Sequence, residues 1–388
     1  MTVTPRPSAL RQRESADRVT NVELFFDLVF VFAVTQLSEF VSEHDTGRGL
    51  VQTAVLLAMV WQIWVYTTWS VNYLDPDRPP TRAMLLALML GSLVLAAALP
   101  EAMHGHGMLF AVTYVVMQVG RALYVIWALR GERLQIAFIR IVSWSGASSV
   151  LVLVGGTAHG DVRTLLWAVA VAIDLIGAAL GFYVPRIGGS ATTEWTISGG
   201  HFAERCQAFV LIALGESIVV MGGDLRIDHP DGHDIAAFGA AFLTAVALWW
   251  VYFDRAAQDS AREIEASRDP GRIARDAFHR IHPLIVGGVI LVAAADRHLF
   301  EHPAEPVATS TAWLMLGGIA LFLAGHAAFK AIVWRIPSWP RLVGAAVALL
   351  LIPLSGHVSV LTLGICGLAV VLAVIIADRL LHPPMPEP

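Results

Sequence analysis

The sequence predicts an all-α protein that crosses a membrane about twelve times, and three observations lead to this fold class. Hydrophobic residues make up 56% of the 388 residues and charged residues only 15%, whereas soluble globular proteins carry about 25% charged residues. Apolar runs of about twenty residues, the length that spans a bilayer, recur from one end of the chain to the other. The charged residues gather between these runs. No stretch is left for a large soluble domain.

The apolar runs can be placed one by one between charged and turn-forming segments. The first twenty residues precede the first run, and they lack the apolar segment and cleavage site of a signal peptide. We therefore expect them to form a disordered cytoplasmic tail. The predicted spans are residues 22–41, 49–74, 82–101, 107–129, 133–154, 163–184, 201–221, 235–254, 276–296, 308–332, 341–355 and 358–378.

Positive charge is concentrated in every second loop. One set of loops contains most of the arginine and lysine, including the long charged segment at residues 254–280. The other set contains only Arg48, Arg163, Arg226 and Arg297. Because cytoplasmic loops carry the excess of positive charge, the first set is predicted to face the cytoplasm, together with both termini. Two termini on one side require an even number of spans, which twelve satisfies.

Three matches in the same order indicate an internal repeat of six helices. LMLGSLVLAAALPE (88–101) aligns without a gap on LIVGGVILVAAADR (284–297), WVY occurs at 64–66 and 250–252, and GRALYVIWALR (120–130) matches GHAAFKAIVWR (325–335). An even number of helices gives both copies the same orientation in the membrane. The sequence therefore predicts two parallel repeats, related by an axis along the membrane normal.

The repeat predicts five segments along the chain. Two six-helix membrane repeats are joined by a cytoplasmic connector, and short cytoplasmic tails precede and follow them. In order, the predicted segments are residues 1–21, 22–184, 185–200, 201–380 and 381–388. The helix that opens the second repeat is then the counterpart of the helix that opens the first.

Acidic residues at the start of the first helix are the first candidate functional residues. Glu23 and Asp27 lie four residues apart and therefore on one face of that helix. Phe25, Leu28 and Phe32 occupy the opposite face. We expect the acidic face to meet something polar and the other face to meet lipid or packed neighbours.

Ionisable residues inside the predicted spans form the wider set of candidates. A charged side chain in a membrane helix costs a few kcal/mol, so it usually has a partner or lines a wet path. Arg205 and Glu216 lie on one face of their helix, about 16 Å apart along its axis, so each needs a partner from another helix. Arg121 could neutralise Asp27 or Asp174, and the sequence leaves structural pairing and an ion path both open. The candidates for this pathway or charge network are Glu23, Asp27, Arg121, Asp174, Glu204, Arg205, Glu216 and His326.

Three motifs carry a resemblance to a known family. The segments ELFFDLVFVFAVTQLS (23–38), NYLDPDR (72–78) and HFAERCQAFVLIALGESIV (201–219) resemble the bacterial low temperature requirement protein A (LtrA) family. The resemblance extends from the first to the last predicted helix. Members of the family are multipass membrane proteins linked by name to growth in the cold. The resemblance therefore implies a protein of the bacterial inner membrane, and it implies no particular chemistry.

A more distant similarity is to lysosomal and bacterial potassium channels with two repeats of six helices. In those channels a Phe-Ser-Asp motif opens the first helix of each repeat, and these helices line the pore. Here Phe26 replaces the serine, and Ala208 stands where the second aspartate would be expected. The departures put an equivalent pore in doubt. What the similarity implies is a central path flanked by the two leading helices.

The charges and the repeat favour a transporter or channel for a small cation or a proton. The alternative is a membrane protein that transports nothing and acts in cold or membrane-stress adaptation through lipid or partner binding, with residues 254–280 as a partner-binding segment. No zinc motif or serine-hydrolase elbow is present, so neither an enzyme nor a cofactor or metal site is predicted. The expected partners are the lipid bilayer and a small cation or proton. Nucleic acid is not expected, and homo-oligomerisation is left open.

Overall fold

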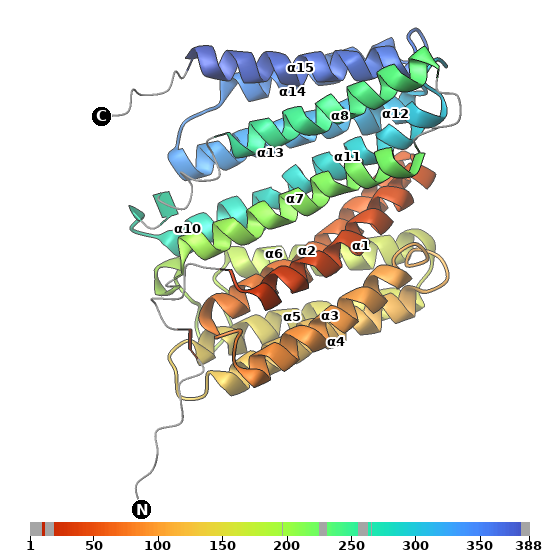
Figure 1. The fold of residues 1–388 in the computed structure, drawn as a ribbon. Coiled ribbons are helices and arrows are strands. Elements are labelled where there is room, and N and C mark those ends of the chain that lie inside the picture. The colour runs from red at the N-terminus through yellow and green to blue at the C-terminus, as the bar shows by residue number, and fades with distance from the viewer. Residues whose placement is uncertain are drawn as a thin grey trace, which may run out of the picture. The chain divides into compact units, whose positions relative to one another are not determined.

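The computed structural model describes residues 10–11, 19–195, 197–224, 231–254, 263–264 and 266–381, and these form helices almost throughout. Extended segments in this part of the chain pair only in isolated bridges, such as that between Leu10 and Leu74. The all-α prediction is confirmed. In chain order (Figure 1), the α-helices are α1 (Asn21–Glu43), α2 (Gly47–Tyr73), α3 (Pro79–Ala98), α4 (Gly107–Ala128), α5 (Gln135–Thr157), α6 (Gly160–Ala179), α7 (Gly199–Asp224), α8 (Gly232–Phe253), α10 (Pro270–Ile273), α11 (His282–Glu301), α12 (Thr309–Ala312), α13 (Gly318–Trp334), α14 (Trp339–Leu351) and α15 (Val360–Leu381).

Shorter helices of other types complete the helical segments. In the described part of the chain, two are 3-10 helices, η2 (Thr192–Glu194) and η5 (Ile352–Leu354). Two others there are π-helices, η3 (Ala274–Ile281) between α10 and α11 and η4 (Trp313–Gly317) between α12 and α13. The π-helices widen the backbone spiral inside otherwise continuous helices, a feature found frequently at functional sites.

Eleven helical segments among the described residues are long and apolar enough to cross a membrane, where twelve were predicted. The segment predicted at 341–355 is the short one, because α14 has 13 residues and η5 adds 3. At 1.5 Å per residue this gives roughly 24 Å, against the roughly 30 Å of a bilayer core. Proline limits the segment at both ends: Pro340 lies in the first turn of α14, and Pro353 lies in η5.

The chain divides into two compact units. Unit 1 comprises Met1–Ala33, Ala58–Arg205 and Glu265–Arg272, and unit 2 comprises Val34–Leu57, Cys206–Ile264 and Ile273–Pro388. Within unit 1, α3 packs on α4, α4 on α5 and α5 on α6 (Figure 1). Within unit 2, α11 packs on α13, α13 on α14, and α15 on both α14 and α8. The two parallel six-helix repeats and their boundaries stay a prediction.

Parts of several predicted segments lie outside the described residues. These are most of the tail at 1–21, residue 196 of the connector 185–200, residues 225–230, 255–262 and 265 of the second repeat 201–380, and most of the tail at 381–388. Residues 255–262 and 265 also belong to the charged segment 254–280.

Local sequence explains where α8 begins. Asp231 is its N-cap, and the carboxylate accepts the N–H groups of His233 at 2.7 Å and Asp234 at 2.9 Å. The side chain of Asp234 accepts the N–H of Asp231 in return, which completes a capping box. The two backbone donors hold the pKa of Asp231 below its ordinary value.

The first helix has two chemically different faces, as the sequence predicts. Phe25 and Leu28 expose 54% and 58% of their surfaces, as apolar side chains do where a helix faces lipid chains. Glu23 and Asp27 expose 0% and 1%. The acidic face of α1 therefore lies inside the protein, in unit 1, and its partners define the candidate site.

Candidate functional site

Five buried side chains from three helices of unit 1 form one group, here called the acid–base cluster: Glu23 and Asp27 from α1, Trp64 from α2, and His201 and Arg205 from α7. The two acids lie four residues apart, and so do the two bases. Residues spaced in this way lie one above the other on a helix surface. The start of α1 therefore presents two acids to two bases on α7, and this matching spacing builds the site.

Asp27 and Arg205 form a bidentate ion pair. Nε of Arg205 donates to Oδ2 of Asp27 at 2.8 Å, and Nη2 donates to Oδ1 at 2.5 Å. The indole N–H of Trp64 donates to the same Oδ1 at 2.6 Å. The guanidinium also lies 5.7 Å from the ring centre of Phe26 and 5.6 Å from that of Trp64, within cation–π range. Planar paired donors of this kind give both strength and fixed orientation.

Glu23 is held by more partners than Asp27. Its Oε1 lies 2.6 Å from Nε2 of His201, 3.2 Å from Nη1 of Arg11 and 3.6 Å from Nη1 of Arg205. Its Oε2 accepts the backbone N–H and the hydroxyl of Thr20, at 2.8 and 2.9 Å. Glu23 also lies in the first turn of α1, where the helix dipole favours a negative charge. All these interactions stabilise the ionised carboxylate.

Both nitrogens of the His201 ring have close polar neighbours. The amide oxygen of Asn72 accepts the N–H of Ser198 at 3.1 Å, so its Nδ2 is the atom 3.1 Å from Nδ1 of His201. Nη1 of Arg11 lies 3.0 Å from Nε2, and Oε1 of Glu23 lies 2.6 Å from the same nitrogen. A histidine and a carboxylate are thus in direct contact, with a guanidinium group beside them.

Among the described residues, the charges of this group balance when His201 is neutral. Two carboxylates, Glu23 and Asp27, face two guanidinium groups, Arg11 and Arg205. Balance matters because the penalty for an unpaired buried ion is several kcal/mol. A proton added to these four charged groups would leave one positive charge in excess among them.

Arg121 and Asp174 are buried in unit 1 but do not join the acid–base cluster. The guanidinium of Arg121 donates to the carbonyl of Ile63 at 3.3 Å and to the side chain of Gln118. Asp174 accepts the hydroxyl of Ser148 at 3.0 Å. Within the part of the chain that the structure describes, Arg121 makes no ion pair within 4 Å with any carboxylate. A direct ion pair of Arg121 with Asp27 or Asp174 is thus not present among the described residues.

The other three candidates lie apart from this group. Glu204 is exposed, and it accepts the backbone N–H of Val19 at 3.4 Å. In unit 2, Glu216 accepts the hydroxyl of Thr35 at 2.5 Å and lies 3.4 Å from Nη2 of Arg297. As predicted, Glu216 and Arg205 both find partners on other helices.

His326 belongs to a second buried group of unit 2. Its Nδ1 accepts the N–H of Nε of Arg341 at 2.8 Å, and Arg341 also pairs with Asp378. The ring of His326 stacks on that of Phe329 at 6.1 Å between centres.

Sequence reasoning missed His201, Trp64, Asn72 and Arg11. His201 was recognisable, because it precedes Arg205 by four residues and so repeats the spacing of the two acids. His201 and Asn72 also each begin one of the quoted motifs. Trp64 begins the WVY match at 64–66, and Arg11 gave no comparable signal.

Breaking the buried pair should destabilise the protein strongly. Replacing Arg205 by methionine leaves Asp27 as an uncompensated buried charge, which costs about 3–5 kcal/mol. Arg82→Met is the matched control, because Arg82 pairs with Asp77 at 2.9 Å on the surface, where both side chains are at least half exposed. That pair is worth about 0–1 kcal/mol. Thermal unfolding in detergent measures both variants, and equal losses would contradict the assignment of a buried pair.

Comparison with known proteins agrees with the resemblance in the sequence. The family model described as bacterial low temperature requirement A protein (LtrA) matches residues 18–376. The chain is 38% identical over 325 residues to the uncharacterized protein RA0937 of Rhizobium meliloti (strain 1021), a match that covers 83% of this chain and 79% of that protein. No solved structure matches the chain. This chain belongs to the bacterial low temperature requirement A family of membrane proteins.

Proposed function

We propose that the protein is a proton-linked transporter in which the acid–base cluster takes up and releases the proton. The observation that carries the proposal is the contact of 2.6 Å between Nε2 of His201 and Glu23, beside the bidentate pair of Asp27 and Arg205. Ionisable residues inside membrane spans carry a large free-energy penalty, and in many transporters they line proton and ion paths.

Protonation of Asp27 would change the pairing between α1 and α7. A neutral Asp27 no longer balances Arg205, whose charge then needs another acceptor. Glu23 is close at hand, because Nη1 of Arg205 already lies 3.6 Å from its Oε1. The guanidinium can thus exchange one carboxylate for the other without entering apolar surroundings. Such an exchange gives proton uptake a structural consequence at the contact between the two helices.

A proton suits this group better than a metal cation. The carboxylates of Glu23 and Asp27 already face N–H donors from Arg205, His201 and Arg11. A metal ion would have to displace these groups and find several oxygen ligands in their place. Among the described residues, no three His, Cys, Asp or Glu side chains come together in a way that could hold a metal ion.

The proposal also places the protein in the bacterial inner membrane with both termini in the cytoplasm. The positive charge of alternate loops supports this orientation, and it requires α14 and η5 to complete a crossing despite their length. A green fluorescent protein fused after residue 388 should therefore fluoresce, because it folds in the cytoplasm. An alkaline phosphatase fusion at the same point should be inactive. The reverse result would place the C-terminus outside.

Proton linkage should be visible in proteoliposomes that trap a pH-sensitive dye. With a pH gradient imposed, monovalent cations, amino acids and sugars are added in turn, and one class should dissipate the gradient. Asp27→Asn removes the proton-binding carboxylate and should reduce this flux at least tenfold. Asp77→Asn, in the exposed pair with Arg82, is the matched control and should retain it. Unchanged flux in the Asp27 variant, or no response to any class, would overturn the proposal.

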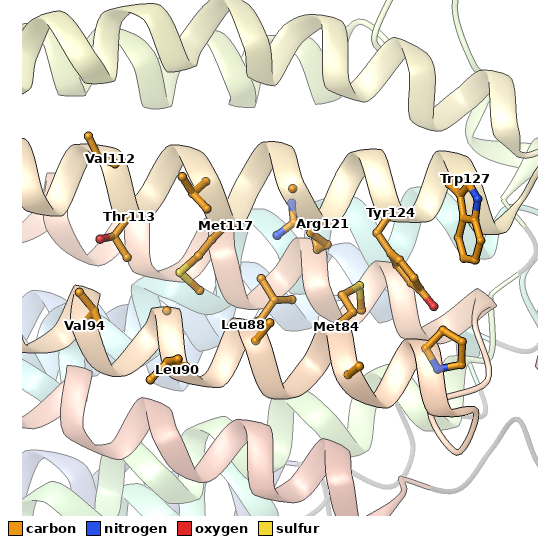
Figure 2. A pocket seen from close by; sticks show the side chains of 16 residues that line it. Met84, Leu88, Leu90, Val94, Val112, Thr113, Met117, Arg121, Tyr124 and Trp127 are labelled. Carbon is orange, nitrogen blue, oxygen red and sulfur yellow. The ribbon is translucent and has the colours of Figure 1, made fainter.

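A lipid-binding protein that transports nothing is the second candidate, favoured by a groove between α3 and α4. Figure 2 shows side chains from both helices along it, including Leu88 and Met117, with Arg121 at its wall. Its volume is about 830 Å³ and its lining is almost entirely apolar. Near Trp127 at one end, the exposed Arg130 follows α4, where it can attract an anionic headgroup. The acyl chain of an anionic phospholipid is therefore the occupant that suits the groove.

Filling the groove tests this second candidate. Gly120 lines it, and a Cβ atom added to this glycine would meet no heavy atom within 4 Å, so Gly120→Phe should place a ring in the groove. Native mass spectrometry should then show loss of bound phosphatidylglycerol that the wild type retains. Ala128→Phe, on the same helix but not among the groove-lining residues, is the control. Equal lipid retention in Gly120→Phe and wild type would contradict the groove as a lipid site.

A further inference from the structure

A buried acid in unit 2 lies outside all the groups described so far. Asp296 is on α11 and exposes 4% of its surface. It lines a small cavity together with residues of α8, η4, α13 and α15, among them Thr244, Met315 and Gly364. The candidate residues predicted from the sequence do not include it, and it is separate in sequence and contacts from the acid–base cluster.

Asp296 differs from the other buried acids, because among the described residues it has neither an arginine within 4 Å nor a hydrogen-bond donor, whereas Asp174 accepts the hydroxyl of Ser148. In this part of the chain, its Oδ2 has no hydrogen-bond partner, and no ion pair forms within 4 Å of its carboxyl group. The side chains that share the cavity come from α8, η4, α13, α15 and α11 itself, and none of them is titratable. By contrast, Asp27 and Glu216 each lie within 4 Å of an arginine.

The surroundings favour the neutral acid over the carboxylate. An ionised carboxylate moved from water into an apolar medium without a partner is penalised heavily, and a group in that position takes up a proton instead. The hydroxyl of Thr244 already donates to the carbonyl of Ala240 at 2.8 Å, so its proton is not free for Asp296. Its oxygen can still accept a hydrogen bond. The side chains lining the cavity thus offer an acceptor to an acid proton and no free donor to a carboxylate.

The cavity is too small and too poor in oxygen for a metal ion. Its volume of about 10 Å³ is at the lower limit for one water molecule. Asp296 and Thr244 are the two lining side chains that carry oxygen, whereas Ca²⁺ takes six to eight oxygen ligands and Mg²⁺ needs a near-ideal octahedron. A proton, with one bridging water at most, is the ligand that fits.

The wall of the cavity includes an irregular helix. Met315 belongs to the π-helix η4, where backbone hydrogen bonds span an extra residue and regular packing is interrupted. Because η4 forms part of the cavity wall, its irregular backbone is the place where the wall can rearrange when the charge of Asp296 changes.

We propose that Asp296 is a proton-binding carboxyl group, protonated in this conformation, which loses its proton only when the cavity lined by α8, α11 and η4 opens to water. The proposal is independent of the acid–base cluster, since it uses other residues in the other compact unit. It predicts a membrane-embedded neutral acid whether or not the protein moves a solute.

Infrared spectroscopy of the full-length protein in lipid tests this directly. At neutral pH, the difference spectrum between wild type and Asp296→Asn should contain the carbonyl stretch of a protonated carboxylic acid, shifted in heavy water. Asp378→Asn is the control, because Asp378 is paired with Arg341 and should contribute a carboxylate band instead. A carboxylate band lost from the Asp296 variant, or no acid band in its difference spectrum, would overturn the proposal.

Thermal unfolding supplies a second readout. The asparagine variant replaces a neutral acid by a neutral amide of the same shape, so its unfolding temperature should equal that of the wild type below about pH 4, where Asp296 is protonated in the folded and the unfolded chain. As the pH rises to neutral, the unfolded wild type ionises at this residue while the folded protein keeps its proton, so the wild type should become the less stable of the two. A variant that unfolds well below the wild type at neutral pH would indicate an ionised, paired Asp296. Neither readout depends on flux, so this inference can fail or hold separately from the proposed function.

Discussion

The ion pair between Asp27 and Arg205 is the interaction on which the arrangement of α1 and α7 in unit 1 depends. Both side chains are almost fully removed from solvent, and neither could stay there alone, because an unpaired buried ion costs several kcal/mol. The second contact, between Glu23 and His201, lies one helical turn away on both helices. Two contacts fix rotation as well as distance. Moving α7 by one residue would turn its bases through about 100° and break both.

The surrounding residues make that geometry specific. Trp64 donates to the oxygen of Asp27 that also accepts from Arg205, and Asn72 holds the far side of the His201 ring. Both come from α2, so three helices converge on one group of charges. Polar networks in apolar surroundings stabilise only when every member is satisfied. Nη1 of Arg205 lies 3.6 Å from Glu23, just beyond the length of a good hydrogen bond. A small shift closes that gap, so a rearrangement after protonation would begin at this nitrogen.

Sequence patterns could predict the helices and the inward face of α1, but they could not predict the pairings. Hydropathy predicts the membrane-spanning helices, because a helix that crosses the bilayer needs about twenty apolar residues. A spacing of four residues places Glu23 and Asp27 on one face of their helix. Partner choice depends on which helices touch, and no period in the chain encodes that. Arg121 shows the difficulty: it has the burial expected of an ion-pair partner, yet it binds a carbonyl and an amide. The short length of α14 was not predicted, because hydropathy measures apolar composition and does not register the prolines that limit this helix.

Among the described residues, the buried acids that pair with arginine and the isolated Asp296 are two kinds of site, and the difference decides which ligand each can bind. Glu23, Asp27 and Glu216 lie within 4 Å of arginine side chains, so a proton added to one of them leaves an arginine charge without its partner. Asp174, which accepts the hydroxyl of Ser148, belongs to neither kind. Asp296 has no such neighbour among the described residues, so removing a proton unbalances a negative one. Protonation therefore has opposite electrostatic consequences at the two kinds of site. It removes a favourable ion pair at the paired acids, and it removes an unfavourable buried charge at Asp296. Neither kind of site suits a metal ion. At the paired acids a metal ion would have to displace guanidinium groups, and at Asp296 it would lack oxygen ligands. The proton is the one cation that the chemistry of both sites accommodates.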